Sequence, residues 1–506
     1  MSLLCCWALL VGHYTVLTTA SEPLLSHVEE SPLEEGGTPL ISSDPLQVCK
    51  QLSSDILILV NPKSGGNKAA GLLTVDTPYH YHESTVNMID IIALANGDAE
   101  AYAGIEALKK SIDNGPPERC EKVVIAGGDG TVTWGVDLMT KAGINLEKVA
   151  IGIIPYGTGN DFSQSLGWGK TIDSTLPGKG NRALNQWIHH WAGASVHYFD
   201  LWQVTVDVHP GGWFTEGAQE QVIQTSEDLK QNALSITKSM SNYFSIGVDA
   251  TILKEFQKKR TRSRAGNHLM YALAGLKTSV RRRVGTESFL DSVKDDGHLL
   301  FNVARRRGST RRENKTLTKN AATIICLNTY TYAGGRRIWE GTYGKGSAII
   351  GYQDETLKDK QQDFGDKKLE LMMYTDVASF SLDAGARAKS TGNRLHQTGG
   401  PLTFEFRSDL DARTPVDFQI DGEYTTAFSP KAATVSHYKR LNVLVNQPRP
   451  GVEEVLEKKE KKKRLNPLLK RRGAQRRPKA PTSSEESIDS DNKLCKGFFG
   501  FKLCRR

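Results

Sequence analysis

Residues 123–131 read Val-Val-Ile-Ala-Gly-Gly-Asp-Gly-Thr, a short apolar run that ends in a glycine-rich turn. An apolar run of this length, bounded by a polar turn, is typical of a strand buried in a parallel sheet. Residues 132–141 follow directly and have a helical pattern. Strand, glycine turn and helix in this order predict one unit of a doubly wound α/β sheet.

Two further apolar runs, residues 56–60 and 149–154, have the same form, and a helical stretch at about 85–112 lies between them. From about residue 197 the chain changes to short runs separated by Gly, Asp and Pro, which is typical of an antiparallel sheet or sandwich. We therefore expect the α/β fold class, with a β-rich sandwich-like domain after the doubly wound one. The strands expected in this second domain are residues 198–208, 243–249, 322–328, 369–374, 402–406 and 418–420.

The N-terminus carries an apolar run from Leu3 to Leu17, followed by small residues near Ala20. This run is too short for a membrane span and suits a secretory signal peptide, which predicts a protein of the secretory pathway or a secreted one, peripherally associated with membranes. No Lys or Arg precedes the run. An uncleaved anchor therefore stays open, as does a cytoplasmic, membrane-associated protein with acylated Cys5 and Cys6.

Seven cysteines in 506 residues do not make a disulfide framework. Only Cys49, Cys120 and Cys326 fall in the body of the chain, and none has a C-x-x-C partner or a His/Cys spacing suited to zinc. We expect these three to be structural or incidental thiols.

The net charge of +8 belongs to the C-terminal tail. Residues 451–480 carry 12 Lys and Arg against 4 Asp and Glu, whereas residues 1–450 carry 48 against 49. A neutral body gives no reason to expect nucleic-acid binding. The tail is expected to bind an anionic membrane surface, the alternatives being a solvated disordered segment or a nuclear-localisation signal.

Three glycine-rich turns follow the three apolar strands: NPKSGGN at 61–67, GGDGT at 127–131 and PYGTGND at 155–161. Ligands of open α/β sheets bind outside the carboxyl ends of the strands, where glycines let backbone N–H groups approach a polyphosphate. A single turn of this kind could simply be tight, but three at one edge favour a phosphate site. The chain has no G-x-x-x-x-G-K-[ST] loop, and Gly157-Thr158-Gly159 lacks a third dinucleotide glycine. These absences exclude a P-loop kinase and argue against a Rossmann dehydrogenase.

The motifs continue with NYFSIGVDA at 242–250, YAGG at 332–335 and DGE at 421–423. In this order, over roughly residues 55–440, the chain resembles eukaryotic diacylglycerol kinases. GGDGT alone is shared with NAD kinases and with sphingosine and ceramide kinases, but those lipid kinases usually have a bulky apolar residue where Thr131 stands. Thr133 and Gly135 depart from the family pattern.

The resemblance implies transfer of the γ-phosphoryl group of ATP to the hydroxyl of 1,2-diacylglycerol, giving phosphatidic acid, with ATP as co-substrate and Mg²⁺ as cofactor. It implies that Asp129 belongs to the metal and phosphate network, and that Glu423, or else Asp421, is the general base. The residues expected around nucleotide and metal are Asn61, Ser64, Gly65, Gly66, Gly127, Gly128, Gly130, Thr131, Gly157, Thr158, Gly159 and Asn160.

Several alternatives stay open. The acceptor could be a sphingoid base or ceramide, or the chain could be a catalytically inactive scaffold that binds lipid or nucleotide. Asp421-Gly422 could be an ordinary hairpin turn. Asp161 could cap the following helix or touch the ligand, and Lys63 could meet phosphate or be solvated.

The expected organisation therefore has five parts, with the active site in the crevice between the two folded domains. In chain order they are a signal peptide (1–20), a flexible leader (21–53), an α/β catalytic, ATP-binding domain (54–195), a β-rich accessory and lipid-substrate domain (196–445) and a basic disordered tail with an aromatic and Cys end (446–506). Two charged stretches of the second domain, 280–320 and 355–366, are expected to be loop insertions.

Overall fold

The structure is a computed structural model in which the described residues all belong to one compact unit, residues 45–506. They are residues 49–172, 175–216, 221–224, 234–257, 285–303, 315–317, 320–350, 354–376, 379–380 and 390–446. The predicted signal peptide, and the basic tail after Asn446, lie outside them.

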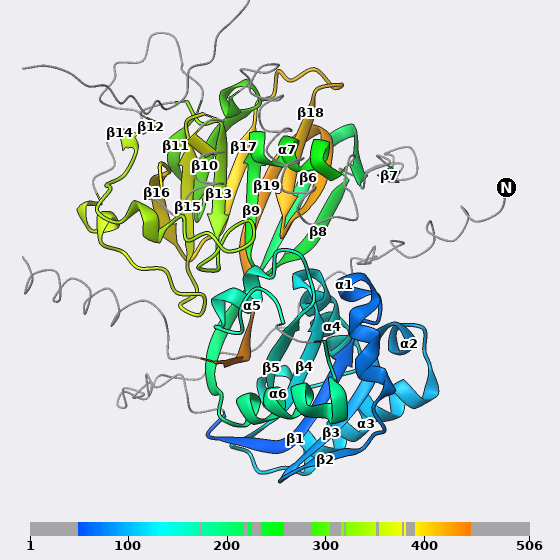
Figure 1. The fold of residues 1–506 in the computed structure, drawn as a ribbon. Coiled ribbons are helices and arrows are strands. Elements are labelled where there is room, and N and C mark those ends of the chain that lie inside the picture. The colour runs from blue at the N-terminus through cyan, green and yellow to red at the C-terminus, as the bar shows by residue number, and fades with distance from the viewer. Residues whose placement is uncertain are drawn as a thin grey trace, which may run out of the picture. The chain divides into compact units, whose positions relative to one another are not determined.

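The N-terminal part is a mostly parallel sheet with the strand order β2-β3-β1-β4-β5, and its helices are labelled in Figure 1. Its strands are β1 (Gln51–Val60), β2 (Tyr79–Tyr81), β3 (Ser84–Asp90), β4 (Arg119–Gly127) and β5 (Val149–Pro155). Its helices are α1 (Ser64–Asn67), α2 (Ile91–Ala95), α3 (Ala99–Asn114), α4 (Asp129–Lys141), α5 (Asp161–Ser165) and α6 (Arg182–Ala192), with 3₁₀ turns η2 (Lys68–Thr74), η3 (Leu146–Lys148) and η4 (Lys179–Asn181). Every residue of β5 is buried, which agrees with the prediction that its continuous apolar run forms a buried parallel strand.

The helix predicted over 85–112 is wrong at its start. Residues 84–90 form β3, which pairs with β1 in parallel and places Val86 and Ile89 in the core. Asp90 then caps α2 by accepting a hydrogen bond from the backbone N–H of Ile92. Sheet pairing therefore decides the conformation of a segment whose own pattern suggested a helix.

A disulfide joins Cys49 to Cys120, at the start of β4. This corrects the prediction that both are thiols; Cys326, in contrast, is a buried free thiol. The two bonded residues are 71 positions apart in the sequence, so their proximity depends on β1 and β4 lying side by side.

The β-rich part is built around two long strands, β6 and β19, which pair with each other; β19 also pairs with β17 and β18, and the strands enclose an apolar core. In Figure 1 the orange strand β19 lies beside the green strand β6. The strands are β6 (Ser195–Glu216), β7 (Gln221–Gln224), β8 (Ser235–Met240), β9 (Tyr243–Gly247), β10 (Leu290–Asp295), β11 (His298–Asn302), β12 (Thr316–Leu317), β13 (Thr323–Leu327), β14 (Ile349–Ile350), β15 (Leu369–Tyr374), β16 (Asn393–Thr398), β17 (Leu402–Phe406), β18 (Pro415–Ile420) and β19 (Glu423–Val445). The helical elements are α7 (Val248–Gln257), η5 (Thr286–Ser288), η6 (Glu340–Thr342) and η7 (Glu355–Lys358).

The prediction of a loop insertion over residues 280–320 is wrong for residues 286–302. They form η5 and the β10–β11 hairpin, which pairs with β17 and buries Leu290, Val293 and Phe301. The arginine runs that suggested a loop, at 281–283, 305–307 and 311–312, lie outside the described residues.

The two parts of the fold are tied together by β19. β19 pairs with β6 as far as its last residue, Val445, and residues 442–443 also pair in parallel with β5, so that they extend the N-terminal sheet. Tyr330 and Phe364, which belong to the β-rich part, are packed into the core of the N-terminal part.

Candidate active site

The three glycine turns meet at one edge of the N-terminal sheet. A Cβ atom added to Gly128 would lie 2.9 Å from the Cα of Gly157, so the turns after β4 and β5 touch backbone to backbone. The turn after β1 joins them: Asn61 Nδ2 donates a hydrogen bond to Thr131 Oγ1 (3.2 Å), and Gly65 packs on the ring of Tyr156. The structure thus brings together residues that the sequence separates by about a hundred positions.

Individual members of these turns have different environments. Gly65 and Gly66 have left-handed φ angles of 63° and 69°, which glycine adopts without strain. Asn160 is 1% exposed and donates from Nδ2 to the carbonyls of Gly157 and Lys170, whereas its Oδ1 has no partner among the described residues. The other expected members lie in the same three turns: Ser64, Gly127, Gly130, Thr158 and Gly159.

Asp129 is the first residue of α4, and its carboxylate accepts hydrogen bonds from the backbone N–H groups of Asp161 (3.1 Å) and Phe162 (3.2 Å). It therefore caps α5, a role that the sequence did not suggest. Burial raises the pKa of Asp129, and the negative charge of Asp161 raises it further, although the two backbone hydrogen bonds oppose the shift.

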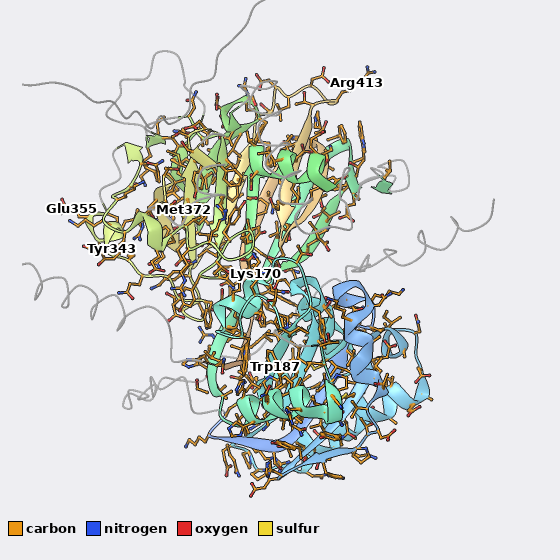
Figure 2. The ribbon with its side chains drawn as sticks, in the orientation of Figure 1. Lys170, Trp187, Tyr343, Glu355, Met372 and Arg413 are labelled. Atoms are coloured by element: carbon orange, nitrogen blue, oxygen red, sulfur yellow. A yellow bond between two sulfur atoms is a disulfide. The ribbon has the colours of Figure 1, made fainter. Side chains whose placement is uncertain are left out.

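Asp161 does not cap the helix that it begins. Its carboxylate accepts hydrogen bonds from the backbone N–H groups of Gly334 (2.8 and 3.0 Å) and Gly335 (2.9 Å) in the β-rich part. Burial raises the pKa of Asp161, against which these hydrogen bonds act. Lys170, labelled in Figure 2, donates to the carbonyl of Gly334 (2.5 Å) beside it. The motif at 332–335 can be recognised in the sequence, but nothing near it in the sequence indicates that its partner is Asp161.

The two candidate bases differ sharply. Asp421 and Gly422 are the central residues of the two-residue hairpin between β18 and β19, with φ of 49° and 86°. The carboxylate of Asp421 accepts from Ser241 N and Oγ, Asn242 N and Tyr243 N, at 2.7–2.9 Å. Glu423 is exposed, and its Oε1 would lie 3.9 Å from a Cβ atom added to Gly130. The Glu423 carboxylate therefore approaches Gly130 of the GGDGT turn, whereas the Asp421 carboxylate is held by residues 241–243, although its charge contributes to raising the pKa of Asp129.

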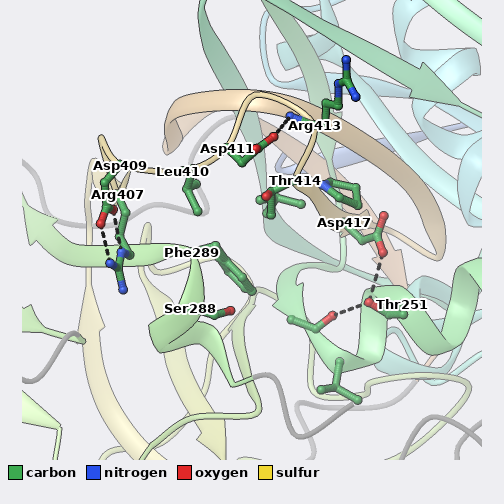
Figure 3. A pocket seen from close by; sticks show the side chains of 14 residues that line it. Thr251, Ser288, Phe289, Arg407, Asp409, Leu410, Asp411, Arg413, Thr414 and Asp417 are labelled. Atoms are coloured by element: carbon green, nitrogen blue, oxygen red, sulfur yellow. Dashed lines mark hydrogen bonds and ion pairs between the residues drawn. The ribbon is translucent and has the colours of Figure 1, made fainter. Parts of the chain in front are cut away.

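A separate cavity of about 680 Å³ lies at the other end of the strands that carry this site (Figure 3). The Asp421 carboxylate accepts a hydrogen bond from Tyr243 N at the start of β9, whereas Gly247, at the end of β9, lines the cavity. Pro415, the first residue of β18, also lines the cavity, and Asp421 follows the other end of this strand. Its charged side chains are already paired in part: Arg407 with Asp409, and Asp417 with Thr251 and Lys254.

The chain is similar to several diacylglycerol kinases. It is 26% identical over 302 residues to the eye-specific diacylglycerol kinase of Drosophila melanogaster, covering 58% of this chain and 18% of the relative. It is 25% identical over 316 residues to diacylglycerol kinase 4 of Arabidopsis thaliana (56% and 61%) and 23% identical over 398 residues to human diacylglycerol kinase iota (77% and 31%). The chain thus spans less than two thirds of the length of each of these relatives.

These relatives overturn the predicted location in the secretory pathway. They are named as diacylglycerol kinases, and no name among them refers to a secreted protein. Among the residues that the structure describes, no helix is long and apolar enough to cross a membrane. The predicted signal peptide itself lies outside these residues.

Two family models match this chain in succession. Residues 55–187 match the diacylglycerol kinase catalytic domain, and residues 239–424 match the diacylglycerol kinase accessory domain. Together the matched ranges take in more than half of the chain, and they contain the three glycine turns, the 332–335 turn and both candidate bases. The chain therefore belongs to the diacylglycerol kinase family.

Proposed function

We propose that the chain transfers the γ-phosphoryl group of ATP to the hydroxyl of 1,2-diacylglycerol, which yields phosphatidic acid. The observation that carries this proposal is the approach of Glu423, from the accessory part, to Gly130 in the glycine turn of the catalytic part. The Glu423 carboxylate, the proposed proton acceptor, thereby lies close to a loop suited to binding phosphate.

Phosphoryl transfer depends mainly on alignment and on neutralisation of charge. In the proposed complex, backbone N–H groups of the turns at 64–66, 127–131 and 157–160 bind the ATP phosphates. The buried Oδ1 of Asn160, which has no hydrogen-bond partner among the described residues, supports a ligand there, because buried polar atoms are normally satisfied. Any side chain at Gly128 or Gly157 would fill the junction between the turns.

Mg²⁺ fits the same turns through a single carboxylate. The described residues contain no group of three or more His, Cys, Asp or Glu side chains that could hold a metal ion. Mg²⁺ commonly keeps several waters and binds one or two carboxylates together with substrate phosphates. Asp129 would supply the carboxylate, and the ion would neutralise phosphate charge. Because the pKa of Asp129 is raised, binding a cation must displace a proton from its carboxyl group.

Glu423 is the proposed general base, and Asp421 is proposed to orient it. With four hydrogen bonds accepted from residues 241–243, the Asp421 carboxylate holds the hairpin from which Glu423 projects. Glu423 is exposed to the incoming acceptor and able to take its proton.

The test is a lipid panel (diacylglycerol, ceramide, sphingosine, or no lipid) with radiolabelled ATP, run on the full chain and on Glu423→Gln. We expect label in phosphatidic acid alone, and a loss of ~10²–10⁴ in kcat for Glu423→Gln with ATP binding retained. Label in a sphingolipid would replace the proposed acceptor, and absence of transfer to every lipid would favour a scaffold. Full activity of Glu423→Gln would place the base elsewhere.

A further inference from the structure

A buried carboxyl group outside the candidate site is bonded to the turn that holds Asp161. Asp249, near the start of α7, is 0% exposed; its Oδ2 accepts a hydrogen bond from Tyr332 Oη (2.9 Å), and its Oδ1 accepts one from Thr323 Oγ1. A carboxyl group is costly to bury unless hydrogen bonds satisfy it. The Asp249 carboxyl group therefore fixes the position of the Tyr332 side chain.

Tyr332 begins the turn that reaches the catalytic part. Its backbone exchanges hydrogen bonds with Arg336 (2.8 and 3.2 Å), which closes residues 332–336 into a narrow loop. Within it, Gly334 and Gly335 have φ angles of 88° and 113°, a conformation that side chains rarely adopt. This backbone geometry points two successive N–H groups at the Asp161 carboxylate.

The hydrogen bonds continue to the phosphate-binding turn. The backbone N–H groups of Asp161 and Phe162 are bonded to the Asp129 carboxylate, and Thr331 Oγ1 donates to the Asp161 carbonyl (3.2 Å). One unbroken series of contacts therefore runs from Asp249 through Tyr332, the glycine turn and Asp161 to Asp129.

We propose that Tyr332 and Asp249 are positioning residues for phosphoryl transfer: they set the 332–335 turn, and through Asp161 they set the orientation of the Asp129 carboxylate. Neither residue is proposed to touch substrate. The inference rests on the proposed function, since Asp129 matters to the rate only if it serves the phosphates. An error of about 1 Å in such a group can cost about 10²-fold in rate.

Tyr332→Phe is the test, because it removes one hydroxyl and keeps the ring contacts with Tyr243 (centroids 4.5 Å apart) and Phe380 (6.1 Å). Tyr374→Phe is the matched control. Tyr374 is 1% exposed, its ring also contacts Phe380 (5.4 Å), and its hydroxyl is bonded to Ser390 Oγ (3.1 Å) rather than to Asp249.

With the full chain and dispersed diacylglycerol, we expect Tyr332→Phe to lower kcat by about ten- to a hundredfold, the range for a hydrogen bond to a carboxyl group. The KM for diacylglycerol should stay within about twofold. Tyr374→Phe should leave both constants unchanged. In an Asp161→Ala background the effect of Tyr332→Phe should largely disappear, because the series of contacts is already broken there.

An unchanged kcat in Tyr332→Phe, an equal loss in Tyr374→Phe, or full additivity with Asp161→Ala would each overturn the proposal. If the wild-type chain transfers phosphate to no lipid, the proposed function fails by itself. In that case, protection of the Gly334 and Gly335 amides against hydrogen exchange measures their hydrogen bonds to Asp161 directly. Tyr332→Phe should lower this protection and Tyr374→Phe should not; equal protection in both variants would overturn the series of contacts.

Discussion

Replacing Gly128 by Ala should separate the two glycine turns that form the candidate phosphate site. The added Cβ would lie 2.9 Å from the Cα of Gly157, whereas carbon atoms in contact prefer about 3.5–4.0 Å. The obstacle is backbone and cannot rotate away, so the turns must part by roughly 0.6–1.1 Å. A displacement of about 1 Å in catalytic geometry can cost about 10²-fold, and we expect a loss of that size in kcat.

The assay is the initial rate of phosphatidic acid formation at saturating ATP, measured beside thermal unfolding. Overpacking of this kind costs about 1–3 kcal/mol of stability, so the variant should remain folded at 25 °C. Gly193→Ala is the control, because Gly193 has φ of −94° and a Cβ there would meet its nearest atoms at 3.9 Å. Wild-type kcat in Gly128→Ala, at an unchanged unfolding temperature, would refute the claim that the turns must touch.

Three further predictions concern other parts of the chain. Cys49→Ser removes the disulfide that spans 71 residues and should lower the free energy of unfolding by about 2–4 kcal/mol. The stability of this variant should no longer depend on reductant. An unfolding midpoint equal to that of the oxidised wild type would count against the bond. Because burial and the Asp161 charge raise the pKa of Asp129, the folded chain holds a proton that the unfolded chain releases as pH rises above about 4, and stability falls in that window. Asp129→Asn should lessen this fall by at most about 1.4 kcal/mol per pH unit, which urea unfolding at several pH values would detect; an unchanged slope would show that Asp129 does not titrate there. Truncation after Val445 removes the basic tail and should sharply reduce sedimentation with anionic vesicles while activity on detergent-dispersed lipid remains, since each charge near the surface contributes roughly 1 kcal/mol; equal sedimentation of both proteins would reject the tether.

The local sequence was sufficient to identify the three parallel strands and the turns that follow them. The runs at 56–60, 123–126 and 149–154 lie in β1, β4 and β5, because a strand buried on both faces must be apolar throughout. The strands predicted at 322–328, 369–374 and 402–406 correspond to β13, β15 and β17. Residues 84–90 were not identified as a strand, since their conformation depends on the neighbouring β1 rather than on their own period.

Only the tertiary structure decided which partner each polar group has. Asp161 and Gly334 are 173 positions apart, and Asp421 and Ser241 are 180 apart, yet each pair is hydrogen-bonded. The sequence supplied the residue types: glycines able to adopt positive φ, and carboxylates able to accept several N–H groups. Periodicity and turn propensity act over a few residues, whereas these contacts join segments that lie far apart in the sequence and are brought together by the tertiary fold, in which β19 pairs with β5 of the N-terminal sheet.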